Sequence, residues 1–436
     1  KFCVESLNAE DRFEIIRFST EAEPVFGKLV KASPKARKKA VKFVDSVRAI
    51  GGTAIEEALL DASSTVSEKA SEGRPTQIIF MTDGQPTIGA IDEDVIINSL
   101  SKKLKNVKSR VRVFCFGIGT NVNTHLLDKI TENTNAISQY VLPEEDIEYK
   151  VSRFYSKISE PVLANLKIGI EGPERVHKIY PKALPDLFKG DQMVVMGRYK
   201  PGKKIATVTL TGTIRGEKQN FSYKAAFHRE NKGNSFIPRL WATRRVGYLL
   251  DEIRLHGEKK ELKEEVANLA RKYGIVTPYT SYLILEDEEA REVPLARRSI
   301  GGVAPGAPAP LVAKDRAELT ARAKESYDSF KSEKSGDLAV RGAAAGSVLK
   351  NASGLSAYGA ARKITDSKQA EAKKQLTNEN RIVSGKTFHR VGNVWIDDDA
   401  RDDSKQKIEE LKFGTKEYFD FLEKHPEMIQ WLSLGT

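Results

Sequence analysis

The chain has 436 residues, of which 40% are hydrophobic and 30% charged, as in ordinary globular proteins. This length predicts about two to four domains. The longest apolar runs are six to eight residues, whereas a transmembrane segment needs ~18 residues, so we expect none. Two cysteines exclude a disulfide scaffold, and six scattered histidines without metal-ligand spacing argue against a zinc site.

The net charge of +11 is unevenly distributed. Residues 1–160 hold 23 basic and 23 acidic side chains. Residues 161–290 hold 23 basic and 16 acidic ones, and the remaining residues hold 25 basic and 21 acidic ones. A basic surface can attract nucleic acid or acidic glycans. Because the middle of the chain has no RNA-binding aromatic signature, zinc finger or basic helix, we favour a solvated basic face and expect no specific nucleic-acid partner.

Residues 12–160 alternate between strand and helix patterns. Strands are predicted near 12–19, 76–82, 111–117 and 138–142, and helices near 34–50, 55–66, 92–107, 123–133 and 144–159. The run 76–82 is continuously apolar, which is typical of a strand buried on both faces of a parallel sheet. We therefore predict an α/β domain with a doubly wound, mainly parallel sheet, with 76–82 in its interior. Cys115 is expected to be buried in the strand 111–117.

The pattern changes after residue 160. Short runs at 166–170, 193–199, 205–210 and 221–227 predict an antiparallel β module over 161–235. Residues 236–290 predict a helical hairpin with its corner at His256-Gly257, followed by a strand at 279–286.

The rest of the chain divides into two parts. Residues 291–380 have the composition of a low-complexity linker, in which 314–332 can form local helix and 296–313 is expected to be the first site of proteolysis. Residues 381–436 predict a small C-terminal α+β module, with a hairpin at 386–396 turning at Gly392-Asn393 and helices near 415–424 and 426–432.

Two polar residues stand where parallel sheets bind ligands. Asp83 follows the strand 76–82, and Thr53 follows the helix break Gly51-Gly52. Ligands of open α/β sheets bind beyond the carboxyl ends of the strands, and carboxylate and hydroxyl oxygens suit Mg²⁺. Each motif also has a purely structural interpretation: Thr53-Ala-Ile-Glu56 has the form of a helix capping box, and Asp83-Gly84 that of a tight turn.

Four segments together carry a family resemblance over about 160 residues: Leu7 to Phe18, Gly51 to Leu59, Ile78 to Gly84, and Val113 to Gly119 with Leu126-Leu127. They resemble von Willebrand factor type A domains, so 1–160 is interpreted as a partial domain of this type. The segments Tyr180 to Tyr199, Leu240 to Leu250, Tyr273 to Ser281 and Gly385 to Trp395 are similar to inter-alpha-trypsin inhibitor heavy chains and their bacterial relatives.

The resemblance implies a metal ion-dependent adhesion site of five side chains. Thr53 and Asp83 match two of these metal ligands, and a D-x-S-x-S motif after the first strand supplies the other three. No D-x-S-x-S precedes Leu7, so we expect a chain truncated at its N-terminus that binds Mg²⁺, or Mn²⁺ or Ca²⁺, weakly or not at all.

Three functions are compared. The resemblance implies a non-enzymatic, extracellular or cell-envelope adhesion module whose protein partner offers an acidic group to the cation. A structural or assembly protein with a non-functional metal site is the alternative. A metal-dependent hydrolase is less favoured, because the chain has no Walker A loop, H-E-x-x-H or G-x-S-x-G motif. The sequence shows no signal peptide and does not define the oligomeric state.

Overall fold

The computed structural model describes most of the chain. The exceptions are residues 49–50, 68–74, 108–110, 159–160, 189–191, 215, 230–233, 235, 276, 291–312, 384–385 and 392–393, and most of 355–379, 398–414 and 426–436. The chain divides into two compact units: residues 1–231 together with 333–347, and residues 232–332 together with 348–436. None of the described helices is long and apolar enough to cross a membrane.

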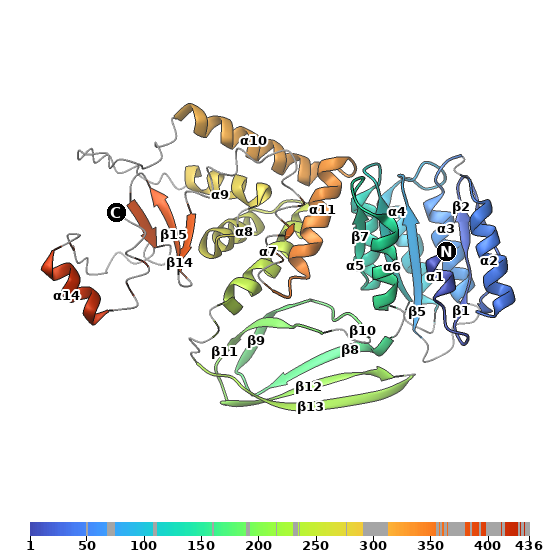
Figure 1. The fold of residues 1–436 in the computed structure, drawn as a ribbon, viewed down its shortest axis with the longest axis horizontal. Coiled ribbons are helices and arrows are strands. Elements are labelled where there is room, and N and C mark those ends of the chain that lie inside the picture. The colour runs from blue at the N-terminus through green and yellow to red at the C-terminus, as the bar shows by residue number, and fades with distance from the viewer. Residues whose placement is uncertain are drawn as a thin grey trace. The chain divides into compact units, whose positions relative to one another are not determined.

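A three-stranded parallel sheet is the centre of the first unit. Strands β5 (Thr76–Thr82), β6 (Val111–Ile118) and β7 (Ser138–Val141) lie in that order, with β6 in the middle. The flanking helices are α3 (Ile55–Ser67), α4 (Glu93–Lys105), α5 (Thr124–Thr134) and α6 (Ile147–Ile158) (Figure 1). Seven of the eight residues of β6, Cys115 included, are buried, and Phe154 of α6 packs edge-on against Phe114 and Phe116. The predicted doubly wound α/β fold is confirmed.

The prediction of one continuous strand over residues 12–19 is wrong. This segment forms β1 (Arg12–Phe13) and β2 (Ile16–Phe18), which pair antiparallel with β4 (Val30–Lys31) and β3 (Ala22–Pro24). The break falls at Glu14, whose carboxylate accepts hydrogen bonds from the amides of Ile15, Phe26 and Lys28. These bonds turn the chain back on itself and stop one continuous strand from forming. Helices α1 (Phe2–Glu5) and α2 (Pro34–Ser46) flank these hairpins in the sequence.

Strand β5 is at an edge of its sheet, and not in the interior as predicted. Among the described residues no strand pairs with its outer side, since β2 pairs with β3 instead. An open hollow of about 2190 Å³ lies along β5, with Leu59 and Val66 of α3 and Val151 and Tyr155 of α6 among its lining residues. Consequently several apolar residues of β5 stay partly exposed, whereas those of β6 are buried.

The predicted antiparallel β module follows. Strands β8 (Pro161–Glu171), β10 (Leu187–Phe188), β12 (Ile205–Ile214) and β13 (Glu217–Ala226) form a sheet in the order β10-β8-β12-β13. A separate two-stranded ribbon pairs β9 (Arg175–Tyr180) with β11 (Met196–Lys200). The module is joined to the parallel sheet by a buried ion pair between Arg112 of β6 and Asp186.

The second unit is helical. The expected hairpin is present as α7 (Phe236–His256) and α8 (Lys260–Tyr273), and its corner is at Gly257, where φ is +92°. The strand expected at 279–286 is wrong, because Pro278–Ala290 forms helix α9. Thr277 caps this helix: its hydroxyl accepts from the Thr280 amide, and its own amide donates to the Thr280 hydroxyl. This local cap overrides the β-forming tendency of the aromatic and β-branched run that follows.

The segment expected to be a linker contains two packed helices. α10 (Ala313–Ser332) matches the helix that the composition allowed at 314–332, and its Phe330 stacks on Tyr279 with ring centres 4.1 Å apart. The second, α11 (Asp337–Lys350), buries Ala339 and Val340. Small alanine side chains can fill closely packed interfaces, so low aromatic content did not preclude burial here. The protease-sensitive region proposed at 296–313 lies almost wholly outside the described residues.

The last part of the chain forms a three-stranded antiparallel sheet and a helix. β15 (Lys386–Val391) and β16 (Val394–Asp397) are the predicted hairpin, and β14 (Asn380–Val383) adds a strand that was not predicted. The turn at 392–393 lies outside the described residues. α14 (Lys416–Lys424) starts after Thr415, whose hydroxyl accepts from the Tyr418 amide. The helix predicted near 426–432 falls mostly in undescribed positions.

Candidate metal centre

Thr53 and Asp83 come together at the carboxyl edge of the parallel sheet. Asp83 directly follows β5 and is exposed, and Thr53 is half-buried two residues before α3. Gly84, the residue after Asp83, lies close to Thr53, since a Cβ added at position 84 would be only 3.3 Å from the Thr53 Oγ1. Both predicted ligand residues therefore lie at one corner of the sheet, on two different loops.

Hydrogen bonds between Thr53 and Thr87 hold these two loops together. The Thr53 amide donates to the Thr87 hydroxyl at 2.8 Å, and the Thr87 amide donates back to the Thr53 carbonyl at 3.0 Å. Gly52 packs against Ile88, and a Cβ at position 52 would lie 2.4 Å from the Ile88 side chain. This close approach explains the need for glycine before Thr53. Together with the hydrogen bonds, it fixes the Thr53 backbone relative to the loop that carries Asp83.

The side-chain oxygens of the two residues, which would be the metal ligands, are not used in other interactions among the described residues. Among the residues that the structure describes, neither the Thr53 hydroxyl nor the Asp83 carboxylate makes a hydrogen bond or ion pair. The helix begins at Ile55, and the Ala54 carbonyl accepts the first helical bond from Ala58, so Thr53 is not its capping residue. The capping-box interpretation is thus wrong, because the helix starts one residue too late for it. A hydroxyl and a carboxylate oxygen fit a hard divalent cation.

We expect Thr53→Ala to leave stability nearly unchanged. The hydroxyl caps no helix, so its removal should alter the free energy of unfolding by less than about 0.5 kcal/mol, as for an ordinary surface substitution. Urea unfolding of both proteins measures this difference. A loss near 1 kcal/mol, the usual cost of a removed N-cap, would restore the capping interpretation.

A segment from far along the chain closes this corner of the first unit. Its residues Lys334 to Gly336, here called the clasp, precede α11. The Lys334 carbonyl accepts from the Thr124 amide at the start of α5 (2.7 Å), and the Gly336 amide donates to the Thr120 carbonyl (2.8 Å). The Gln85 amide nitrogen donates both to Ser335 (3.1 Å) and to Asn121 (3.2 Å). The clasp is therefore hydrogen-bonded to Gln85, which is two positions after Asp83.

A buried carboxylate, Glu93, anchors the clasp. It is 6% exposed and receives hydrogen bonds from Lys129 (3.0 Å) and Asn123 (3.0 Å), with the Lys334 ammonium 2.8 Å away. Burial acts to raise the pKa of Glu93, but the bonds from Lys334, Lys129 and Asn123 outweigh it and lower that pKa to about 2. Sequence reasoning missed this network, because Glu93 and Lys334 are far apart along the chain and Lys334 lay in the supposed linker.

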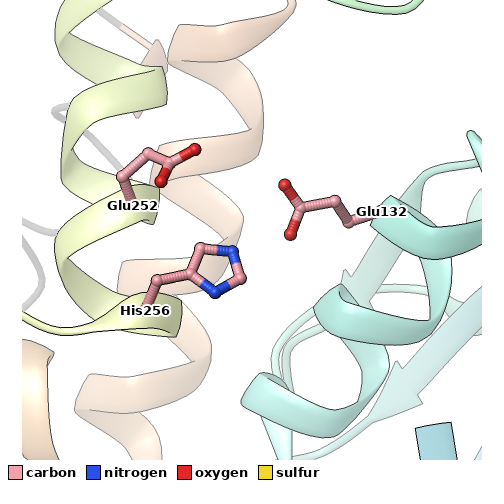
Figure 2. Close-up of side chains that lie close together, drawn as sticks. All are labelled: Glu132, Glu252 and His256. Atoms are coloured by element: carbon pink, nitrogen blue, oxygen red, sulfur yellow. The ribbon is translucent and has the colours of Figure 1, made fainter. Parts of the chain in front are cut away.

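A second group of carboxylate and imidazole side chains involves both units. Figure 2 shows Glu252 and His256, one turn apart on α7, together with Glu132 of α5. Glu132 belongs to the first unit and the other two to the second. The relative positions of the units are not determined, so we assign no site to these three residues.

Sequence comparison agrees with the geometry. A family model of the von Willebrand factor type A domain matches residues 1–140. Inter-alpha-trypsin inhibitor heavy chain H4 of Homo sapiens is 28% identical over 316 residues, which are 69% of this chain and 33% of that protein. Residues 1–140 match the von Willebrand type A domain, and the chain as a whole is similar to inter-alpha-trypsin inhibitor heavy chains.

Other relatives agree. Heavy chain H6 of Homo sapiens is 29% identical, and the match covers 66% of this chain and 23% of that protein. Heavy chain H2 of Sus scrofa is 26% identical, and the match covers 68% of this chain and 33% of that protein. The chain spans about a third or less of these curated relatives. Among solved structures, a von Willebrand factor type A protein from Catenulispora acidiphila has a TM-score of 0.42 and 16% identity, covering 74% of this chain and 82% of that one.

Proposed function

We propose that the von Willebrand type A domain binds a protein ligand through a divalent cation at the carboxyl edge of its sheet, with Thr53 and Asp83 as two of the metal ligands. The observation that carries this proposal is that Gly84, next to Asp83, lies close to the Thr53 hydroxyl, while neither that hydroxyl nor the Asp83 carboxylate is hydrogen-bonded among the described residues. We propose no enzymatic activity and an extracellular or cell-envelope location.

The chemistry follows from the ligands. Mg²⁺ prefers oxygen ligands and retains several waters when a site offers few carboxylates. One carboxylate leaves positive charge on the ion, so an acidic group of a partner protein would replace a water and complete the coordination. Mn²⁺ or Ca²⁺ could be held by the same oxygens, with Ca²⁺ accepting more of them.

The remaining ligands belong, in this proposal, to a strand paired with the open edge of β5. In the family the first strand ends in the D-x-S-x-S motif, which would bring three more side chains to the same corner. The hollow along β5 supports this placement, because its walls of α3 and α6 leave room for an apolar strand beside β5. Without these ligands, we expect the 436-residue chain to bind Mg²⁺ only weakly.

The test is a Mg²⁺ titration by thermal shift and calorimetry. We expect little stabilisation of the 436-residue chain and a clear stabilisation of a version extended upstream by the first strand, reaching about 2.7 kcal/mol at 100 times the Kd. In the extended version Asp83→Ala should abolish the shift. Asp328→Ala, which removes a half-buried aspartate from the second unit, is the matched control and should leave the shift intact.

Two results would decide against the proposal. If the extended protein binds Mg²⁺ equally well after the substitution Asp83→Ala, Asp83 is not a ligand. If it binds none at all, the alternative of a structural protein with a non-functional site takes its place. Hydrolytic activity that requires the metal would instead contradict the non-enzymatic assignment.

A further inference from the structure

Strand β13 is an open edge of the β module. Among the described residues it pairs with β12 alone, and it is the outermost strand of its sheet in Figure 1. All ten of its residues are in unbroken register with β12, whereas the pairings of β8 with β10, of β8 with β12 and of β9 with β11 each contain a register shift. Edge strands are commonly kept short or interrupted by a proline or a bulge, and β13 has none of these features. Its outward backbone groups can therefore pair with another strand.

One face of β13 is apolar and exposed. Phe221 lies opposite Leu210 of β12, and Tyr223 lies opposite Val208. Residues directly opposite in an antiparallel pair share a face of the sheet, and Leu210 packs against the buried core of the module. Phe221 and Tyr223 thus project from the core-facing side, yet they are 36% and 58% exposed. Because an antiparallel sheet normally turns its apolar side to the core, this exposed aromatic pair indicates a surface that a partner covers.

An extended strand is the partner that uses both features. It can pair its backbone with β13 and place alternate apolar side chains over the aromatic residues. The β13 strand of a second copy meets both requirements. Two equal edge strands pair antiparallel about a two-fold axis perpendicular to the sheet, and such an axis keeps the apolar faces of both copies on the same side.

The charges of β13 exclude one of its two longest self-pairings. The axis pairs residues that share a face, so it must pass through one residue of the strand. The longest pairings then cover residues 217–225 or 218–226 of each copy. In the first of these, the axis passes through Phe221 and Lys218 lies opposite Lys224, twice in the dimer. Like charges directly opposite one another destabilise a strand pair.

The second self-pairing has complementary side chains. Its axis passes through Ser222, and Phe221 of each copy lies opposite Tyr223 of the other. Aromatic cross-strand pairs stabilise antiparallel strands. Both lysines of the strand then lie opposite uncharged residues, Asn220 and Ala226. The same lysines that disfavour the first register are therefore compatible with this one.

We propose that β13 mediates a symmetric dimer of this chain, in which the β13 strands of two copies pair antiparallel about Ser222. The two four-stranded sheets then form one continuous sheet, with Phe221 and Tyr223 of both copies on the same face. Backbone hydrogen bonds provide the affinity, and the aromatic pairs select the register. This interface is separate from the proposed cation centre and requires no metal.

The first measurement is sedimentation velocity of the 436-residue chain in EDTA at concentrations up to about 100 μM, since interfaces of modest quality dissociate in the micromolar range. The parent should dimerise. Phe221→Lys/Tyr223→Lys places like charges opposite one another twice and should weaken dimerisation at least about tenfold. The control Ile91→Lys/Val95→Lys makes the same change at two exposed apolar residues elsewhere in the first unit and should dimerise as the parent does.

A complementary pair of variants tests whether the loss comes from charge. Phe221→Glu/Tyr223→Glu should also be monomeric by itself. Mixing it with Phe221→Lys/Tyr223→Lys should restore a dimer that contains one copy of each, because opposite charges then lie across the two-fold axis. Recovery of the mixed dimer also shows that both variants are folded. A mixture that stays monomeric, while circular dichroism shows both variants folded, would contradict the pairing.

A disulfide locates the axis. In a Cys3→Ser background, where Cys115 is buried, Ser222→Cys should cross-link two copies on mild oxidation. Directly opposite residues have Cα atoms about 4.5–5.5 Å apart, which a disulfide can span. Asn220→Cys should not cross-link, because its equivalent lies four residues further along the strand, at least about 13 Å away.

Three results would overturn the inference. The first is a parent that remains monomeric at every concentration. The second is a dimer that the lysine variant leaves unchanged, which would place the interface elsewhere. The third is a cross-link through position 220 and none through position 222, which would exclude the register. None of these results depends on Mg²⁺, so failure here leaves the proposed cation centre untouched.

Discussion

Asp186→Ala is expected to destabilise the first unit by about 3–5 kcal/mol, the usual cost of leaving one member of a buried ion pair without its partner. Asp186 and Arg112 are almost fully buried, with side-chain exposures of 6% and 4%. Both carboxylate oxygens accept from the Arg112 guanidinium, and one also accepts from the Asn165 amide at 2.9 Å. The variant leaves the guanidinium buried with its bond to the Asn135 carbonyl but without its counter-charge.

Urea unfolding of parent and variant, followed by near-ultraviolet circular dichroism, measures this loss. Glu217→Ala, at an exposed position of β13, is the control and should change the free energy of unfolding by less than about 0.5 kcal/mol. The double variant Arg112→Met/Asp186→Leu should recover much of the loss, because it leaves no unpaired charge. A loss below about 1 kcal/mol for Asp186→Ala would mean that the pair does not couple the β module to the parallel sheet.

Glu93→Gln is expected to destabilise the protein by about 2–3 kcal/mol at pH 7 and hardly at all near pH 2. The pKa of Glu93 is about 2 in the folded protein, against the ordinary value of 4.5. A carboxyl group whose pKa is lowered by folding stabilises the folded state fully at pH values above its ordinary pKa. This stabilisation is lost as the pH falls from about 4.5 toward 2. At about 1.4 kcal/mol for each pKa unit this shift sets an upper value of about 3.5 kcal/mol, and the expected loss is smaller because the lysines are partly exposed.

Urea unfolding of parent and variant at several pH values between about 7 and 2 provides the measurement. The difference between the two proteins should be largest above about pH 5 and shrink as the pH falls. Comparing the pair removes the contributions of other carboxyl groups, which are common to both proteins. A difference that does not vary with pH would show that Glu93 acts through packing and not through its charge.

The sequence alone was sufficient to predict the strands and helices that have a clear local pattern of apolar residues. The apolar runs of β5 and β6 and the periodic stripes of α3, α7 and α8 identified those elements correctly, and the motif order placed Thr53 and Asp83 at one corner. These predictions succeed because a parallel sheet brings the ends of its strands to one edge.

The failures have physical causes that periodicity does not reveal. The aromatic and β-branched run after Pro278 became a helix because Thr277 and Thr280 exchange hydrogen bonds at its start. The strand expected at 12–19 broke where Glu14 bonds amides more than ten residues away. The clasp was missed because Gln85 and Ser335, which bond to each other, are 250 residues apart in sequence.

The return of residues 333–347 to the first unit means that this unit is built from two separate stretches of chain. A shortened protein ending at residue 231 would therefore lack the partner of the Thr124 amide and one cationic partner of Glu93, even though it contains every strand of the parallel sheet. Conversely, a single backbone cut between 232 and 332 would leave both stretches of the unit present as separate fragments, joined without a covalent link by the clasp. We therefore expect the two fragments to remain associated after such a cut.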